Sequence, residues 1–283
     1  MNINPKITVV TVCYNTVRSI EKTILSVINQ IYPNIEYIII DGGSTDGTVD
    51  IIKKYSDKIA YWVSEPDGGI YDAMNKGIKA ATGEWINFMN AGDWFLSIHV
   101  LDDLSKKLSD NIKILRGNII RIYDNFKVKS EGITSQEPSF MEMISSTFHH
   151  QACLISHDLF SKFGLYSTHY KLCSDWKFFF DCIILHHVKT KYIDYSVAAF
   201  RMDGTSSMHT IDYNEECAAY LGNLYGEDIV SYLEELKFYR RFSFLKSLYH
   251  FYKREINCMS PKTFNRILNL KRVIYSIFGK KVH

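Results

Sequence analysis

Long hydrophobic runs and a leader-like start are both missing from the sequence. No window holds about 18 uninterrupted apolar residues, so the sequence predicts no membrane-spanning helix. The first residues, Met1 to Lys6, lack a charged segment followed by an apolar one, which argues against a secretory signal peptide. We therefore expect the chain to act in the cytoplasm.

Cysteine pairs at metal-ligand spacing are also missing. The six cysteines stand at positions 13, 153, 173, 182, 217 and 258. This scatter argues against a zinc site and, in a cytoplasmic chain, against disulfides, so we interpret them as small buried apolar residues. Internal repeats and low-complexity linkers are absent as well. With 283 residues, 46% of them hydrophobic, the chain can bury a substantial core, most simply as one large α/β domain with an appendage.

Strand-like and helix-like patterns alternate through the first 90 residues. The expected strands are 7–12, 35–40, 59–63 and 85–89, and the expected helices are 20–31, 49–55 and 70–81. Gly83 stands where the glycine after a helix end belongs. Strands that alternate with helices predict a parallel sheet covered on both faces, with all carboxyl ends at one edge.

Polar residues follow three of these strands, and ligands of open α/β sheets bind at the carboxyl edge. The segments are Tyr14-Asn15, Asp41-Gly42-Gly43 and Asn90-Ala91-Gly92-Asp93. We expect them to converge on one crevice. Any one of them alone could be an ordinary loop, since Gly, Asp and Asn are common turn formers.

The pattern is less regular after Asp93. The expected elements are a helix at 99–109, strands at 112–115 and 118–123, a hairpin or mobile loop at 127–136, a strand at 148–155, a helix from about 174 to 185, and aromatic-rich helices in 213–283.

Four segments carry a resemblance to a known family through their order and spacing. They are Val9–Asn15, Ile38–Thr48, Glu65–Gly77 and Glu84–Trp94. Together they resemble the family 2 glycosyltransferases with the GT-A fold, most closely the bacterial members that build surface polysaccharides such as colanic acid and O-antigen. The resemblance implies a Rossmann-like α/β fold with a mostly parallel central sheet flanked by helices. It also implies an enzyme that transfers a sugar from a nucleotide donor.

Three regions follow from this resemblance. Residues 1–98 would be the nucleotide-sugar-binding half and residues 99–212 the acceptor-binding half of the same GT-A domain. Residues 213–283 would be a basic, aromatic-rich helical extension.

Donor binding is assigned chiefly to the loops of the first region. Tyr14 can stack on a nucleobase, and Asp41 can accept a hydrogen bond from a uracil N–H or a ribose hydroxyl. A core tyrosine and a turn-capping aspartate are the structural alternatives, and an i, i+4 salt bridge is the alternative for Asp72 and Lys76. The full donor-binding set that the resemblance implies is Val12, Tyr14, Asn15, Asp41, Gly43, Asp67, Asp72, Asn75, Lys76, Asn90, Ala91 and Gly92.

Asp93 is the expected ligand of a divalent metal, Mg²⁺ or Mn²⁺. A departing UDP gains negative charge, which a metal anchored by a carboxylate can compensate. The resembled family usually presents Asp-x-Asp or Asp-Asp at this place, whereas this chain has Asn90-Ala91-Gly92-Asp93. Asn90 would then be a neutral replacement for the first acid. A plain turn at the strand end is the alternative.

Asp175 is the expected general base. Inversion at the anomeric carbon requires a base that takes the proton of the acceptor hydroxyl. Asp175 would lie at a helix N-terminus, which favours its ionised form, and the resemblance places the base here. An ordinary helix N-terminal carboxylate is the alternative.

Three further residues are assigned to the acceptor or the diphosphate. His150 and Gln151 form a His-Gln pair before an apolar strand, which recurs in the resembled subgroup. Arg201 begins a segment with the composition of a flexible lid and could reach the diphosphate. A hydrogen-bonded structural histidine is the alternative for His150.

The charge of the chain is unevenly distributed. Residues 237–283 contain twelve Lys or Arg and one acidic residue, Glu255, which leaves 21 basic and 30 acidic residues before them. Helices with basic and aromatic faces bind a membrane interface without spanning it. Nucleic acid is the competing partner, and a helical lid or dimer contact is a third possibility. We favour the membrane surface and no nucleic acid, because the body is acidic and resembles a sugar transferase.

These observations predict an inverting hexosyltransferase that moves a hexose from a UDP-sugar to a lipid-linked (polyprenyl diphosphate) saccharide. It would act in surface polysaccharide, O-antigen or lipopolysaccharide biosynthesis, as a peripheral protein on the cytoplasmic face of the inner membrane. The sequence does not decide between a monomer and a homo-oligomer. The alternative is a catalytically silent nucleotide-sugar-binding scaffold of a membrane assembly. A nucleotidyltransferase with a similar sheet is a third reading.

Overall fold

The computed structural model describes residues 4–201, 210–226 and 229 of the chain. By its internal contacts the chain divides into two compact units, Met1–Pro138 with Ser146–Thr210, and Ser139–Ser145 with Ile211–His283. Every residue assigned to the site above lies in the first unit. The three predicted regions stay predictions, and the expected membrane-binding segment 237–283 lies outside the described residues.

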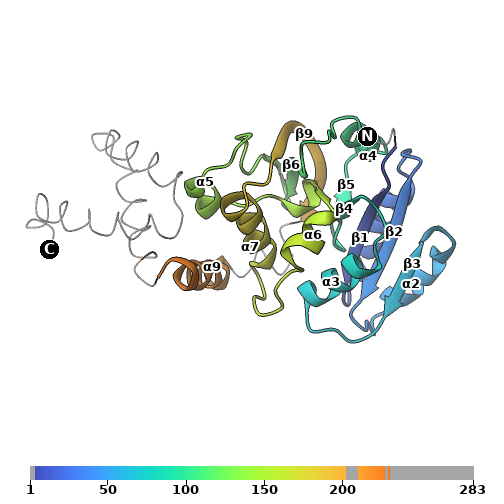
Figure 1. Cartoon of the computed structure of the whole chain (residues 1–283). Helices are drawn as coiled ribbons and strands as arrows, with labels where there is room; N and C mark the ends of the chain where they lie inside the picture. Colours follow the sequence, from blue (N-terminus) through green and yellow to red (C-terminus); the bar gives the residue numbers. More distant parts are fainter. Residues whose placement is uncertain (1–3, 202–209, 227–228, 230–283) are drawn as a thin grey trace, which may run out of the picture. The chain divides into compact units, whose positions relative to one another are not determined.

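One mixed sheet runs through the first unit (Figure 1). Within the described residues its nine strands follow the order β3-β2-β1-β4-β8-β6-β9-β5, with β7 paired to β6. The strands are β1 (Ile7–Cys13), β2 (Ile35–Asp41), β3 (Tyr61–Ser64), β4 (Trp85–Phe88), β5 (Trp94–Phe95), β6 (Ile114–Ile122), β7 (Lys127–Ser130), β8 (Cys153–Ser156) and β9 (Thr190–Arg201).

Helices connect and cover these strands. In the first unit they are α1 (Ile20–Ile28), α2 (Thr48–Lys54), α3 (Ile70–Ala80), α4 (Val100–Ser105), α6 (Asp158–Phe163) and α7 (Ser174–Phe180), with short turns η1 (Ser56–Lys58), η2 (His150–Ala152) and η3 (Asp181–Leu185). The second unit contains α5 (Phe140–Ser145) and α9 (Thr210–Tyr225). Among the described residues, no helix is both long and apolar enough to cross a bilayer.

The N-terminal half of the sheet is the predicted parallel βαβ arrangement. Strand β1 pairs in parallel with β2 and β4, and β2 pairs in parallel with β3. Every residue of β1 is buried, as expected for a parallel strand covered on both faces. Helix α3 packs closely on β1 at Gly77. A Cβ added at this glycine would lie only 2.4 Å from Val10 Cγ1, so no larger residue fits without a shift.

Strand directions in the second half decide which loops reach the site. Strand β8 is antiparallel to both β4 and β6, and β9 is parallel to β6. Strands β6 and β9 therefore run in the same direction as β1 to β4, and their carboxyl ends lie at the same edge of the sheet. Strands β5, β7 and β8 run the other way, so the sheet as a whole is mixed.

Two predicted elements differ from the structure at a glycine. The strands expected at 112–115 and 118–123 are one strand, β6, and its register with β9 shifts on both sides of Asn118. A Cβ at Gly117 would lie 2.6 Å from the carbonyl oxygen of Tyr195, so this glycine marks close backbone approach rather than a break between strands. Gly83 is likewise not a helix-capping glycine. A Cβ there would lie 2.5 Å from Thr8 Oγ1 and 2.8 Å from Lys6 O.

The helix expected from 174 to 185 is also modified. Helix α7 ends at Phe180, and Asp181–Leu185 continue as a π-helical turn. The strand expected over 148–155 begins only at Cys153, because residues 150–152 form the turn η2. The second change places His150 in a turn rather than in a strand, while Asp175 lies in the first turn of α7 as expected.

Candidate active site

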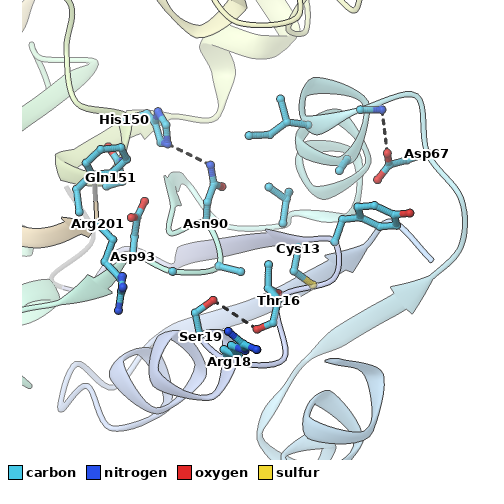
Figure 2. A pocket seen from close by; sticks show the side chains of 18 residues that line it. Cys13, Thr16, Arg18, Ser19, Asp67, Asn90, Asp93, His150, Gln151 and Arg201 are labelled. Atoms are coloured by element: carbon cyan, nitrogen blue, oxygen red, sulfur yellow. Dashed lines mark hydrogen bonds between the residues drawn. The ribbon is translucent and has the colours of Figure 1, made fainter. Parts of the chain in front are cut away.

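A pocket of about 680 Å³ lies at the carboxyl edge of the sheet (Figure 2). Its walls come from the loops after β1, β3 and β4, from η2 and from the end of β9. The predicted site residues that line it are Val12, Tyr14, Asp67, Asn90, Ala91, Gly92, Asp93, His150, Gln151 and Arg201. The convergence expected from the alternation of strands and helices is therefore present in the structure.

Hydrogen bonds between the loops after β1 and β2 hold one wall of the pocket. Asn15, at a positive φ of 50°, donates its backbone N–H to Ser44 Oγ at 2.7 Å, and its side-chain oxygen accepts from the Thr45 N–H at 3.0 Å. A Cβ at Gly42 would lie 2.7 Å from Asp67 Oδ2, so the loop after β3 also packs tightly here. Tyr14 remains 63% exposed on this wall, available to a planar ligand.

Asp41 is fully buried and fixes its own loop. Its carboxylate accepts hydrogen bonds from the backbone N–H of Gly43 and from Ser44 and Ser64 Oγ. Burial alone would raise its pKa, but the hydrogen bonds from the two serines outweigh burial and lower it. These contacts are those of the turn-capping alternative. Asp41 does not line the pocket, and its direct contact with uridine stays a prediction.

The Asn90–Asp93 turn presents the expected metal ligand at the pocket. The Asp93 N–H donates to Asn90 O at 3.0 Å, and Gly92 adopts the positive φ of 104° that this turn needs. Thr23 of α1 clamps the turn, since its hydroxyl donates to Asp93 O at 2.7 Å and accepts from the Gly92 N–H at 3.0 Å. Backbone contacts therefore place the Asp93 carboxyl group.

The electrostatics of Asp93 suit a cation. Its side chain is buried, and burial raises its pKa to about 7, with a hydrogen bond from Gln151 and the charge of His150 acting in the opposite direction. A divalent cation would offset the cost of ionising this buried group. Asn90 Oδ1, in the same turn, is buried without a hydrogen-bond partner. Both are hard oxygen donors, as Mg²⁺ and Mn²⁺ prefer.

Asp93 is the single ionisable donor in this turn. Among the described residues, no group of three or more His, Cys, Asp or Glu side chains could hold a metal ion. A metal at this place would thus take most of its ligands from the diphosphate and water, as Mg²⁺ commonly does. The residues present fit a substrate-borne metal rather than a permanently bound one.

His150 connects the second expected acid to this corner. Its Nδ1 lies 3.1 Å from Asp175 Oδ2. Its Nε2 lies 3.2 Å from Asn90 Nδ2 (Figure 2). Asp175 Oδ1 also accepts a hydrogen bond from the Tyr71 hydroxyl at 2.8 Å. Burial raises the pKa of Asp175, but the hydrogen bond and charge of His150 and the Tyr71 hydroxyl outweigh burial, so its pKa is lowered. Asp175 is kept ionised.

Asp93 and Asp175 both contact the turn that precedes β8. Both acids interact with the η2 turn, Asp93 with Gln151 and Asp175 with His150. They therefore share one corner of the molecule. Asp175 itself does not line the pocket, and the imidazole of His150 stands at the pocket wall instead.

Three of the predicted donor-binding residues lie in α3 and are not among the residues that line the pocket. Asn75 is buried, with its amide bonded to the backbone of Tyr166 at 2.8 and 3.0 Å. Lys76 lies 2.8 Å from Glu65 and 3.8 Å from Asp72, which includes the i, i+4 pair given above as the alternative. Asp72 also accepts from the Gly68 N–H. Their roles in donor binding, like those of Asn15 and Gly43, stay predictions.

Several pocket residues escaped the analysis of the sequence. They are Cys13, Thr16, Arg18, Ser19, Gly69, Ile70, Ala73 and Phe200. Arg18 carried the one usable signal, a cation four residues beyond Tyr14 and just before α1. The others are small or apolar residues whose types indicate no chemistry.

Comparison with family models identifies the class of protein. A model described as Glycosyl transferase family 2 matches residues 8–167. This is more than half of the 283 residues, and the chain therefore belongs to that family.

Two similar sequences are mycobacterial. An uncharacterized glycosyltransferase of Mycobacterium tuberculosis (strain ATCC 25618 / H37Rv) is 41% identical over 106 residues, which are 37% of this chain and 40% of that protein. The PGL/p-HBAD biosynthesis glycosyltransferase of Mycobacterium bovis (strain BCG / Pasteur 1173P2) is 28% identical over 195 residues, or 66% of this chain and 73% of that one. The chain thus matches less than half the length of the first relative.

Two solved structures confirm the predicted fold class. S. aureus TarS 1-349 in complex with UDP-GlcNAc has a TM-score of 0.62 at 18% identity and covers 77% of this chain and 67% of its own. The mannosyltransferase PcManGT of Pyrobaculum calidifontis was solved with GDP-Man and Mn²⁺ and has a TM-score of 0.55 at 13% identity. The match covers 98% of this chain and 88% of the PcManGT chain. The GT-A fold is confirmed. Similarity to colanic-acid and O-antigen enzymes stays a prediction.

Proposed function

We propose that the chain is an inverting glycosyltransferase that transfers a sugar from a UDP-sugar. The observation that carries this proposal is the pocket at the carboxyl edge of a family 2 domain, where Asp93 and the His150–Asp175 pair meet at η2. One acid suits the leaving diphosphate and the other suits the attacking hydroxyl.

The donor would lie between the Tyr14 wall and the Asn90–Asp93 turn. Tyr14 offers its exposed ring to the uracil, and Arg18 and Arg201, which both line the pocket, offer positive charge to the diphosphate. Asp93 would hold Mg²⁺ or Mn²⁺ together with the diphosphate. When bound, the metal supplies Lewis-acid stabilisation of the charge that develops on the leaving UDP.

The acceptor proton would be taken by the His150–Asp175 pair. The side chain of Asp175 is 13% exposed and lies behind His150, whose ring stands at the pocket wall. In the neutral ring with its proton on Nδ1, Asp175 accepts from that nitrogen and leaves Nε2 free to receive a proton in place of its contact with Asn90. Proton removal from the face opposite the nucleotide gives inversion.

The finer assignments rest on the sequence. We propose a hexose as the transferred sugar and a lipid-linked saccharide on polyprenyl diphosphate as the acceptor, in surface polysaccharide or O-antigen assembly. The protein would be peripheral on the cytoplasmic face of the inner membrane. Two observations support this choice: the basic, aromatic composition of residues 237–283, and the similarity to the PGL/p-HBAD biosynthesis glycosyltransferase of M. bovis.

Release of UDP from a panel of UDP-sugars, measured with lipid-diphosphate saccharides and Mn²⁺ present, tests the proposal. We expect release with one donor and its loss in both Asp93→Asn and Asp175→Asn. Asn90 at the place of the first acid favours the scaffold alternative. Tight UDP binding without turnover of any donor–acceptor pair would establish the scaffold and overturn the enzyme.

A further inference from the structure

The turn between β6 and β7 stands at the lip of the pocket. Strand β6 ends at the same sheet edge as β1 and β4, and Ile122 at its end is paired with Lys127 on one side and Arg201 on the other. Arg201 lines the pocket. The turn at residues 123–126 therefore follows directly after the β6 residue that pairs with Arg201, a residue of the pocket wall.

This turn exposes apolar side chains. It is closed by a hydrogen bond from the Tyr123 N–H to Phe126 O at 3.0 Å. The two rings stack with centroids 4.4 Å apart and planes 14° apart, and Phe126 is 57% exposed. Val128, two residues further, is 43% exposed. Stacking restricts the two rings before they are buried, so little side-chain conformational entropy is lost on burial.

Cations surround the turn. Lys127 and Arg201 occupy adjacent strands on either side of Ile122, and both charges lower the pKa of Lys22 on α1, an effect second to burial. Lys22 lies over the Trp94 ring, with Nζ 3.1 Å from the centroid. Asp124, at the tip, is the opposing charge in the turn. The lip of the pocket therefore has exposed aromatic surface and an excess of positive charge.

We infer that this lip, made of Tyr123, Phe126, Lys127 and Lys22, docks on an anionic lipid bilayer and brings the pocket to the membrane surface. Aromatic side chains are enriched at the headgroup level of membranes, and basic residues there bind anionic lipid. The inference deepens the proposed function and rests on it, because a lipid-linked acceptor reaches the pocket only at a membrane.

A second copy of the chain fits this surface less well. A stable dimer buries roughly 1,200 Å² or more, whereas the exposed apolar surface here consists of a few side chains on one narrow turn. Two copies meeting through this lip would also bring like charges together, which disfavours association. Anionic headgroups complement the charge instead.

Bromolipid quenching tests the inference directly. Phe126→Trp in the full chain is mixed with phosphatidylcholine vesicles that contain brominated lipid, with and without phosphatidylglycerol. The matched control is Tyr61→Trp, an aromatic position 47% exposed on β3, at the far end of the strand order. We expect the added tryptophan at 126 to be quenched in anionic vesicles and the one at 61 to behave as wild type. Vesicle binding without quenching at position 126 would mean docking through another part and would overturn the inference.

Charge and apolar variants give the magnitudes by vesicle cosedimentation. Phe126→Asp and Lys127→Glu should each weaken binding to anionic vesicles by about fivefold or more, and Asp124→Asn should strengthen it by about threefold. Tyr61→Asp should change nothing. Equal binding by all four variants overturns the inference. Concentration-dependent dimerisation without lipid, abolished by Phe126→Asp, would establish a second copy as the occupant and also overturn it.

UDP binding separates this inference from the proposed function. None of these variants lies in the pocket lining, so each should bind UDP as wild type does. Normal UDP binding and turnover without any bilayer docking would overturn the docking inference and leave the proposed function intact. Bilayer docking through the turn without UDP binding would contradict the proposed function and leave the docking inference intact.

Discussion

The Nδ1 atom of His150 lies 3.1 Å from Oδ2 of Asp175, although 25 positions separate them. This contact joins η2 to the first turn of α7 and places a charged carboxylate directly behind a pocket-lining imidazole. Two segments that carry no chemistry separately thereby form one acid–base pair.

Asp175→Asn should lower kcat by about 100-fold or more, because a neutral amide no longer stabilises the positive charge that His150 gains when it takes the acceptor proton. UDP affinity should stay near its wild-type value, because Asp175 lies outside the pocket lining. Steady-state kinetics and calorimetric UDP titration measure the two effects. The control is Asp181→Asn, which removes a carboxylate 2.7 Å from Lys177 in the next turn and should retain activity. Equal kcat in Asp175→Asn and wild type would eliminate the pair as the base.

Asp93→Asn should weaken Mn²⁺ binding in the presence of UDP and reduce turnover by about 100-fold, because it removes the ionisable donor of the turn. The fold should be retained, since backbone contacts to Asn90 and Thr23 hold the turn and the buried charge is removed. Thermal unfolding and Mn²⁺ titration with UDP measure both effects. Asp57→Asn, at an exposed position in η1, is the control. An unchanged Mn²⁺ dependence would contradict the assignment of Asp93.

The fold could be predicted because the two hydrophobic periods differ clearly in the first 90 residues. Buried strands such as β1 read as continuous apolar runs, and α1 reads as apolar positions three and four apart. The strand and helix boundaries after Asp93 were harder to predict, because the apolar pattern there is less regular. Gly117 interrupts an apolar run without ending β6, because a glycine can mark close contact with Tyr195 as well as a turn.

The site was predictable where it depended on strand direction and less so where it depended on side-chain direction. Carboxyl ends of parallel strands share an edge, which brought Tyr14 and Asp93 to one pocket. Asp41 ends β2 at the same edge, yet its carboxylate turns inward to Ser44 and Ser64. Asn75 bonds to Tyr166, 91 positions away, a distance that no local pattern encodes.

Gly83→Ala should lower the free energy of unfolding by about 2 kcal/mol, because the added methyl group would meet Thr8 and the backbone of Lys6 at less than 3.0 Å. The Thr8 nitrogen and the Lys6 carbonyl oxygen cannot move without disturbing β1. Urea unfolding followed by circular dichroism measures the change. At Gly222 in α9, nothing lies within 4 Å of an added Cβ, so Gly222→Ala should be neutral or stabilise α9 by up to about 1 kcal/mol. Equal stability of Gly83→Ala and wild type would refute the packing argument.

Glu36→Gln should remove part of the acid sensitivity of the protein. Glu36 is buried and accepts hydrogen bonds from Thr8 Oγ1 at 2.6 Å, from Thr82 N at 2.7 Å and from Lys6 Nζ at 3.1 Å. Burial raises the pKa of Glu36, but these bonds outweigh burial and lower it to about 2 from 4.5. A carboxylate with a lowered pKa stabilises the fold above its unfolded-state pKa, and that contribution is lost as pH falls through the folded-state value.

For Glu36 the loss should therefore fall between pH 4.5 and about 2 and amount to about 3 kcal/mol. Chemical unfolding of wild type and Glu36→Gln across this range gives the difference curve. At neutral pH the variant should be the less stable protein, because the neutral amide cannot accept from Lys6 and both threonine groups as the carboxylate does, and the two curves should approach each other in acid. Glu137→Gln, which removes an exposed carboxylate, should give a nearly flat difference curve. A Glu36→Gln curve parallel to wild type through the acid range would show that these three hydrogen-bonding groups do not favour the charged form.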